Sequence, residues 1–182
     1  MSTHSNIILE KNGNYYVIYS HWDGYPENNG KILLEHYTDP EKIFKLIELG
    51  DISSLGIEIG KKHDFNNPPK DEVNAYHRDR GTSWEQTTYR KFDNKEEALK
   101  ICDNDYTYLF ENGQWFFREW DENFKKLTLK ECGGKENSVE QEVEQEVEQP
   151  EKQETKRVEE IASTHVTGEK LQKLKEALID ED

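Results

Sequence analysis

The chain has 182 residues and a formal net charge of −15 at pH 7, and only 32% of its residues are hydrophobic. Its 4 Trp, 9 Tyr and 7 Phe all lie before residue 125, so only the first part can bury a core that offsets the entropy of ordering. From residue 135 onward there are 15 acidic and 7 basic residues, against 24 and 17 before it. Both parts repel nucleic acid on average, which excludes DNA or RNA binding without a local basic patch.

The ends and the cysteines indicate an intracellular protein. The first residues lack the charged and apolar regions of a signal peptide, and no apolar run is long enough to span a membrane. Cys102 and Cys132 are far apart and have no C-x-x-C partner, so neither a disulfide framework nor a zinc site is expected. We therefore expect a soluble cytoplasmic protein with no metal and no cofactor.

In chain order, the first element is a predicted hairpin. Two β-branched and aromatic runs, 7–10 and 15–19, flank Asn12-Gly13, a pair suited to a type I′ turn. A short helix is predicted over 32–37. A second helix is predicted to begin after an Asp39 N-cap with Pro40 at its first position, and to end near Gly50.

The next segment predicts short strands, one helix and a second hairpin. Strands are expected at 55–59 and 73–77, on either side of an exposed loop over 61–72. Asn94 followed by Glu97 is a capping-box pattern and predicts a helix that includes Ile101. Runs 106–110 and 115–120 flank Asn112-Gly113, which predicts the second hairpin, with aromatic side chains on both of its faces.

The predicted strands and helices do not alternate along the chain as they do in a doubly wound fold. Their order predicts the α+β class: an antiparallel sheet of hairpins with two or three short helices packed on one side, and a disordered acidic C-terminal tail. We expect a compact domain over 1–132 and a disordered linker over 133–165 with a Val-Glu-Gln-Glu repeat. Residues 166–182 are a candidate amphipathic helix for docking or self-association, although a fraying solvated helix is the simpler interpretation.

The loop His21-Trp22-Asp23 is the most prominent chemical group in the sequence. A histidine beside a carboxylate can act as a general base, and a tryptophan can stack on a base or a sugar. The simpler interpretation is structural: His21 and Asp23 hold a tight loop by hydrogen bonds while Trp22 fills the core.

A second group, His77-Arg78-Asp79-Arg80, admits two interpretations. The arginines can clamp a phosphate, or they can form surface ion pairs, which is the safer interpretation. No phosphate-binding glycine loop, nucleophile elbow or protease-type cysteine signature is present. The sequence therefore indicates no particular enzyme class.

Several stretches together resemble a known family. They are residues 19–26, 30–37, 46–56, 59–65 and 76–81, and within them stand the runs His21 to Pro26, Leu33 to Tyr37, Leu46 to Gly56 and Tyr76 to Gly81. This run of motifs resembles a family of small proteins carried by phages and prophages, over about residues 5–120. Some relatives look like inhibitors of type II CRISPR nucleases. The acidic tail has no counterpart in that pattern.

The resemblance implies a counter-defence inhibitor that binds a host RNA-guided nuclease with its guide RNA in the host cytoplasm, through an acidic surface. A protein of charge −15 would be steered toward the basic channel of such a nuclease. The expected binding residues are His21, Trp22, Asp23, Tyr25, Glu27, Asp51, Glu58, Asp64, Asp71, Glu72, His77, Arg78, Asp79, Arg80 and Trp115. The alternatives are a nucleotide- or nucleic-acid-processing enzyme that uses the His21/Asp23 and His77/Arg78 loops, and a non-catalytic adaptor that uses the C-terminal helix.

Overall fold

The computed structural model describes residues 2–134. These residues belong to one unit, Met1–Lys135. The Val-Glu-Gln-Glu repeat and the predicted helix over 166–182 lie outside the described residues.

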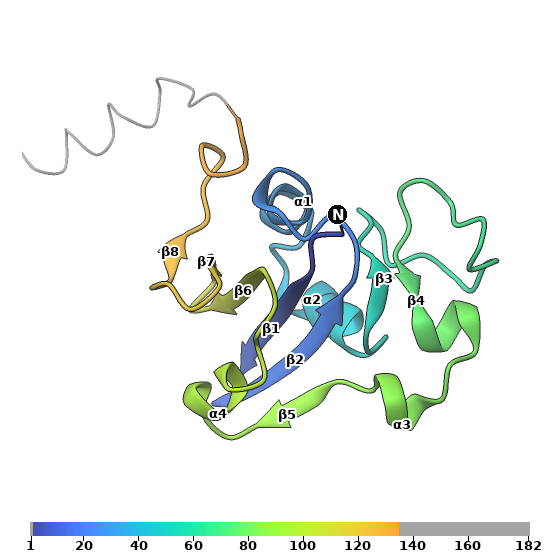
Figure 1. The fold of residues 1–182 in the computed structure, drawn as a ribbon, viewed down its shortest axis with the longest axis horizontal. Helices are drawn as coiled ribbons and strands as arrows, with labels where there is room; N and C mark the ends of the chain where they lie inside the picture. Colours follow the sequence, from blue (N-terminus) through green and yellow to red (C-terminus); the bar gives the residue numbers. More distant parts are fainter. Residues whose placement is uncertain (1, 135–182) are drawn as a thin grey trace, which may run out of the picture. The chain divides into compact units, whose positions relative to one another are not determined.

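The strands form one sheet, with short helices between them (Figure 1). The strands are β1 (Ser5–Lys11), β2 (Asn14–Ser20), β3 (Ile52–Ser54), β4 (Asn74–Ala75), β5 (Arg90–Phe92), β6 (Tyr106–Glu111), β7 (Gln114–Glu119) and β8 (Lys125–Lys126). The α-helices are α1 (Lys31–His36), α2 (Pro40–Ile47), α3 (Trp84–Thr87) and α4 (Lys95–Leu99), and single π-helical turns cover Pro26–Gly30 and Tyr76–Arg80.

The sheet is mixed. Its strand order is β4-β3-β2-β1-β6-β7-β8, and β5 pairs with β2 beside this path. The hairpins β1/β2 and β6/β7 are antiparallel, whereas β1 pairs with β6, and β2 with β3, in parallel. The parallel pairing of β1 with β6 joins the two predicted hairpins into one sheet, with β1 and β2 near its centre (Figure 1).

Both faces of the sheet are covered. Because side chains alternate along a strand, Ile7 and Leu9 face the larger core, which also holds Leu33 of α1 and Ile43 of α2. Ile8 faces the other way, into a smaller core with Val17, Leu109 and the Ala98 side chain of α4. Helices α1 and α2 therefore pack on one face, and α4 packs on the other.

The local predictions are confirmed where turn and cap chemistry decided them. Asn12 and Gly13 have φ of 56° and 76°, and Asn112 and Gly113 have 54° and 76°, the left-handed values that the hairpin turns require. The Asp39 side chain accepts a hydrogen bond from the Glu41 amide at 3.0 Å and caps α2. Asn94 likewise accepts from the Glu97 amide at 2.9 Å and caps α4, which ends at Leu99, before Ile101.

The predicted α+β class is confirmed, and the structure differs from the prediction in detail. The sheet is mixed rather than wholly antiparallel, and α4 covers the face opposite to α1 and α2. The strand predicted at 55–59 is wrong: β3 lies earlier, at Ile52–Ser54, and Glu58 forms only an isolated bridge to Glu72. The strand predicted over 73–77 covers only Asn74–Ala75, and α3, β5 and β8 were not anticipated.

Candidate functional site

The strand register gathers four distant segments at one end of the sheet. Ser5 pairs with both Ser20 and Tyr106, and Tyr106 pairs with Glu119. The residues just before β1 and β6 therefore lie beside those just after β2 and β7. The Tyr106 amide donates to the His4 carbonyl at 3.2 Å, the Trp120 amide to the Asp105 carbonyl at 2.9 Å, and the Gly24 amide to the Thr3 carbonyl at 2.9 Å. We call this surface the acidic end; it comprises His4, Trp22, Asp23, Tyr25, Glu27, Asp105, Tyr106, Glu119, Trp120 and Asp121.

Three large aromatic side chains of the acidic end are exposed to solvent. The exposed fractions are 47% for Trp22, 37% for Tyr25 and 57% for Trp120. Trp120 also has φ of 50°, which is rare for a bulky side chain. Exposed tryptophans that cluster on one surface are typical of interaction sites, where such rings supply most of the contact energy.

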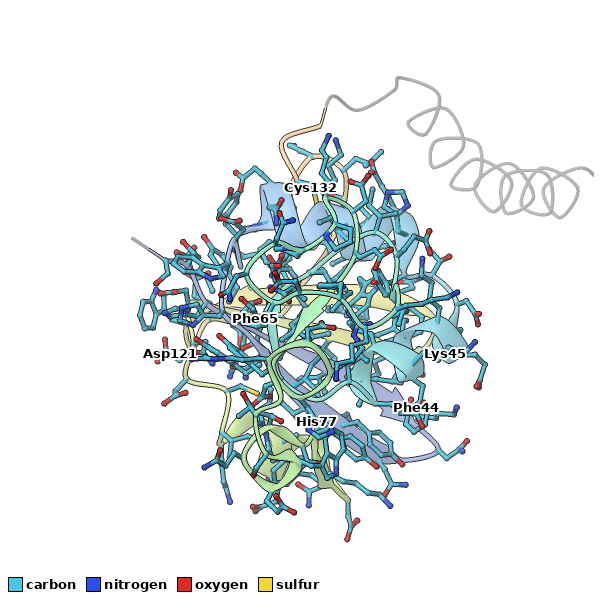
Figure 2. All side chains as sticks on the ribbon, turned by 90° about the vertical axis from the view of Figure 1, so that its right-hand side faces the viewer. Phe44, Lys45, Phe65, His77, Asp121 and Cys132 are labelled. Carbon is cyan, nitrogen blue, oxygen red and sulfur yellow. The ribbon has the colours of Figure 1, made fainter. Side chains whose placement is uncertain are left out.

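Carboxylates lie near Tyr106 in the same surface. The pKa of the Tyr106 hydroxyl is raised, first by burial and then by three nearby carboxylates, those of Glu119, Glu27 and Asp105. Within residues 2–134, none of the five carboxylates of the acidic end forms an ion pair. Asp121 projects at the periphery of the domain, well apart from His77 in the same view (Figure 2). The acidic end thus carries negative charge that forms no ion pair with a lysine or arginine of the described residues.

A histidine and tyrosine group lies under Trp22. The His4 Nδ1 atom lies 2.7 Å from the His21 carbonyl and must donate to it, since a carbonyl only accepts. The Tyr19 hydroxyl lies 2.8 Å from His21 Nδ1 and 3.0 Å from His4 Nδ1. Because His4 Nδ1 already carries a proton, the Tyr19 hydroxyl donates its own proton to His21 Nδ1. Burial and then the His4 ring, 4.7 Å away, lower the pKa of His21. His21 is therefore a neutral imidazole whose Nδ1 is held by its own chain.

The structural interpretation of the first loop is confirmed for His21 but wrong for Trp22. Asp23 forms no hydrogen bond with His21 in the described part of the chain; its backbone carbonyl accepts instead from the Asn29 amide at 3.3 Å and from the Asn28 side chain at 3.3 Å. A His21-Asp23 acid–base pair is thus not assembled. Trp22 does not fill the core, because nearly half of its surface is exposed.

The Arg78-Asp79 group is an internal brace. The Asp79 side chain is fully buried and binds Arg78 Nε at 2.8 Å, the Ala75 amide at 2.7 Å and the His63 amide at 3.2 Å. Arg78 also donates to the carbonyls of Ile59, at 2.6 Å, and Val73. Burial alone would raise the pKa of Asp79, but these hydrogen bonds outweigh it and the pKa is lowered. The ion-pair interpretation is confirmed, with the pair inside the fold, so Arg78 is not free to clamp a phosphate.

Of two further predicted surface residues, Trp115 is buried and Asp51 is partly buried. Trp115 is 3% exposed and donates its Nε1 proton to the Tyr37 carbonyl at 2.8 Å, so the prediction that it binds a partner is wrong. Asp51 accepts two hydrogen bonds from Arg90 at 2.9 Å, and its side chain is only 13% exposed. Its predicted surface role is also wrong, because its carboxylate, like the Trp115 ring nitrogen, is bound to groups of the same domain.

The remaining predicted residues are not among those that make up the acidic end. Glu58, Asp64, Asp71 and Glu72 belong to the chain between β3 and β4, where Glu58 lies 3.7 Å from Lys42 and Glu72 lies 3.6 Å from His63. His77 packs on Trp84, and the Arg80 guanidinium lies 5.4 Å from the centre of the Phe65 ring. No hydrogen bond or ring contact within residues 2–134 joins His21 to His77 or Arg78, the residues of the predicted two-loop catalytic site.

Six of the ten residues of the acidic end were missed from the sequence. The parallel β1–β6 pairing alone brings four of them to the same edge of the sheet as Trp22, and no local sequence pattern predicts that pairing. These four are Asp105, Tyr106, Glu119 and Trp120. The Glu119-Trp120 pair, which follows the apolar run Trp115 to Phe117 and Arg118, is the cue that the sequence contains.

Residues 2–134 contain no group of three His, Cys, Asp or Glu side chains placed to hold a metal ion. In the same range no helix has the length and apolar character needed to cross a membrane. No family model, no curated protein and no solved structure matches the chain.

Proposed function

We propose that this protein is a binding protein that inhibits a host RNA-guided nuclease of type II by placing its acidic end in the basic channel for nucleic acid. The observation that carries this proposal is that the acidic end combines exposed tryptophans with five carboxylates, none of which forms an ion pair within residues 2–134. The resemblance to small phage proteins makes that nuclease class the first partner to test.

The physical chemistry of the acidic end suits such a channel. A guide-loaded nuclease holds its heteroduplex and displaced strand with lysine and arginine side chains. Carboxylates can stand where phosphates would lie, and a net charge of −15 steers the approach. Trp22 and Trp120 add apolar contact area, which holds a complex once it has formed.

The enzyme alternative has less support. Arg78 and Asp79 are bound to their own chain, as described above, and the Nδ1 atom of His21 is bound to Tyr19. The adaptor alternative depends on residues 166–182, which lie outside the described residues. Binding through the acidic end is therefore the function that the geometry supports best.

The test is DNA cleavage by a guide-loaded type II CRISPR nuclease with and without the purified protein, at about 50 mM and about 200 mM salt. We expect inhibition that weakens as salt rises, because exposed charges are screened beyond about 8–10 Å at physiological ionic strength. Inhibition that is unchanged by salt, or absent at large molar excess, would contradict the proposal.

Matched variants separate the acidic end from net charge. The triple variant Glu27→Gln, Glu119→Gln, Asp121→Asn removes three charges from the acidic end. The control triple, Glu48→Gln, Asp93→Asn, Glu96→Gln, removes three exposed charges elsewhere. We expect the first to weaken inhibition by about tenfold or more and the second to leave it nearly unchanged. Equal losses would show that only net charge matters.

A further inference from the structure

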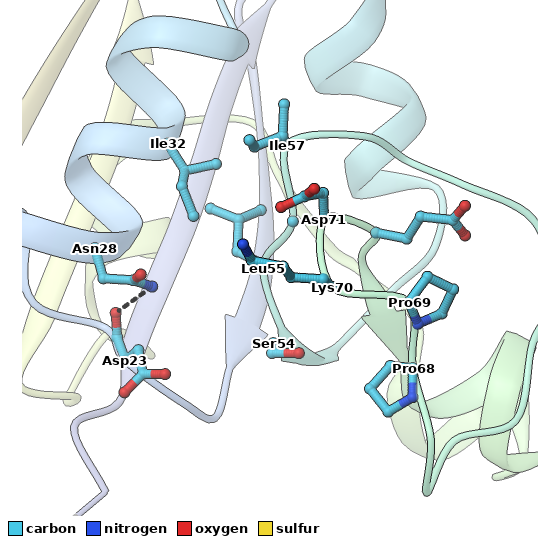
Figure 3. Close-up of a pocket in the computed structure, with 12 residues that line it drawn as sticks. Asp23, Asn28, Ile32, Ser54, Leu55, Ile57, Pro68, Pro69, Lys70 and Asp71 are labelled. Carbon is cyan, nitrogen blue, oxygen red and sulfur yellow. Dashed lines mark hydrogen bonds between the residues drawn. The ribbon is translucent and has the colours of Figure 1, made fainter.

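A cavity of about 410 Å³ opens between α1, the chain after β3 and the segment before β4. Its lining comes from the loop and π-helical turn at Asp23 and Asn28, from Ile32 of α1, and from residues 54–57 and 68–72. Asp23 lies at one end of the cavity and the Pro68-Pro69 pair at the other, with Leu55 between them (Figure 3).

The lining combines an apolar wall with unneutralised carboxylates. The wall is formed by Ile32, Leu55, Ile57 and the two prolines. Asp23 and Asp71 form no ion pair in the described part of the chain, whereas Glu72 is engaged with His63 at 3.6 Å and with the Lys61 amide at 3.3 Å. Lys70 supplies the only positive charge of the lining.

The chain around the cavity is held in place before any ligand arrives. The Tyr37 hydroxyl donates to the Gly56 carbonyl at 2.8 Å, and the Lys42 ammonium donates to the Ile57 carbonyl at 2.8 Å. A side chain at Gly56 would collide with the Glu72 backbone, since an added Cβ would lie 2.3 Å from its carbonyl carbon. A preformed site loses little entropy when it is filled.

We propose that this cavity receives an arginine side chain of the protein partner, with the guanidinium among the lining carboxylates and the aliphatic stem along the apolar wall. The inference rests on the proposed function and names the chemistry that the partner presents there. Long cationic side chains cover apolar surface with their methylenes and keep the charge at a polar rim. Arginine suits the site better than lysine, because its planar fork matches carboxylates and is more weakly hydrated.

Asp23 connects the cavity to the acidic end. It lines the cavity and directly follows Trp22, whose amide donates to the Ser53 carbonyl at 2.9 Å beside the lining residue Ser54. A basic partner segment seated on the acidic end would therefore carry its side chains past the mouth of the cavity.

The test is a titration of the full-length ¹⁵N-labelled protein with a capped Gly-Ser-Arg-Ser-Gly peptide, followed by amide chemical shifts. We expect saturable shifts concentrated at Leu55, Gly56, Ile57 and Asp71. A peptide with citrulline in place of arginine keeps the shape without the charge and should bind about tenfold more weakly or worse. A lysine peptide should also bind more weakly than the arginine peptide.

The variants are chosen to preserve the fold. Asp23→Asn is used because Asp23 has φ of 55°, a conformation that asparagine also tolerates. Asp23→Asn and Asp71→Asn should each weaken binding severalfold, Lys70→Met should tighten it, and the exposed control Glu48→Gln should leave it unchanged. Each variant's own spectrum reports whether it is folded.

Shifts spread over all acidic surfaces, or equal binding of the citrulline peptide, would overturn the inference. Nuclease inhibition that is unchanged in the Asp71→Asn variant while peptide binding is lost would also overturn it, because the partner would then not use the cavity. Peptide binding at the cavity without nuclease inhibition would leave this site intact and overturn the proposed partner.

Discussion

The Arg78-Asp79 brace gives the sharpest prediction about stability. Asp79→Ala removes a fully buried carboxylate and leaves the Arg78 guanidinium and the amides of Ala75 and His63 without their partner. Removing one member of a buried ion pair typically costs about 3–5 kcal/mol, because the other charge stays buried and uncompensated. We expect a loss of this size in the free energy of unfolding.

Urea unfolding followed by tryptophan fluorescence measures this loss. With a slope of about 2 kcal/mol per M, a loss of about 4 kcal/mol lowers the midpoint by roughly 2 M. The matched control is Asp71→Ala, which removes the same charge from an exposed side chain nearby and should cost no more than about 0.5 kcal/mol.

The structure also predicts how the stability difference between the wild type and Asp79→Ala depends on pH. The pKa of Asp79 is lower in the folded protein than its ordinary value of 3.8, so the carboxylate is stabilising above that pH. That contribution is lost as the pH falls through the folded-state pKa, and the stability gap between the wild type and Asp79→Ala should narrow there. A loss below about 1 kcal/mol at neutral pH would refute the brace and return Arg78 to the candidate ligand-binding residues.

Three further predictions follow from buried or paired groups. Trp115→Phe removes the donor to the Tyr37 carbonyl and should lower the free energy of unfolding by about 1–3 kcal/mol in urea; an unchanged midpoint would contradict that bond. By NMR titration His21 should have a pKa below 6.5, and His4→Gln should raise that pKa by removing a positive neighbour; no change would exclude the coupling. Burial raises the pKa of the Cys102 thiol to about 12, so it should react with a disulfide reagent at about pH 8 far more slowly in the folded than in the urea-unfolded protein.

Local structure followed closely from neighbouring residues. The Asn-Gly pairs at 12–13 and 112–113 require left-handed backbone angles, and the side chains of Asp39 and Asn94 satisfy amides two or three residues further on. These interactions close within a few residues, so the sequence itself contains both partners. The two central hairpins, helix α2 and the start of α4 were therefore predictable.

What the sequence by itself determined is thus the α+β class and its local elements, while the site was decided by tertiary structure. The acidic end exists because β1 pairs in parallel with β6, about a hundred residues later, and brings Glu119 and Trp120 at the end of β7 to the same edge of the sheet as Trp22, with β1 and β6 in between. The exposure of Trp22 and the burial of Trp115 depend on which distant elements pack against them. Two parallel strands are not joined by a short turn whose sequence would predict their pairing. Burial, in turn, depends on the surface that packs against a residue rather than on the residue type.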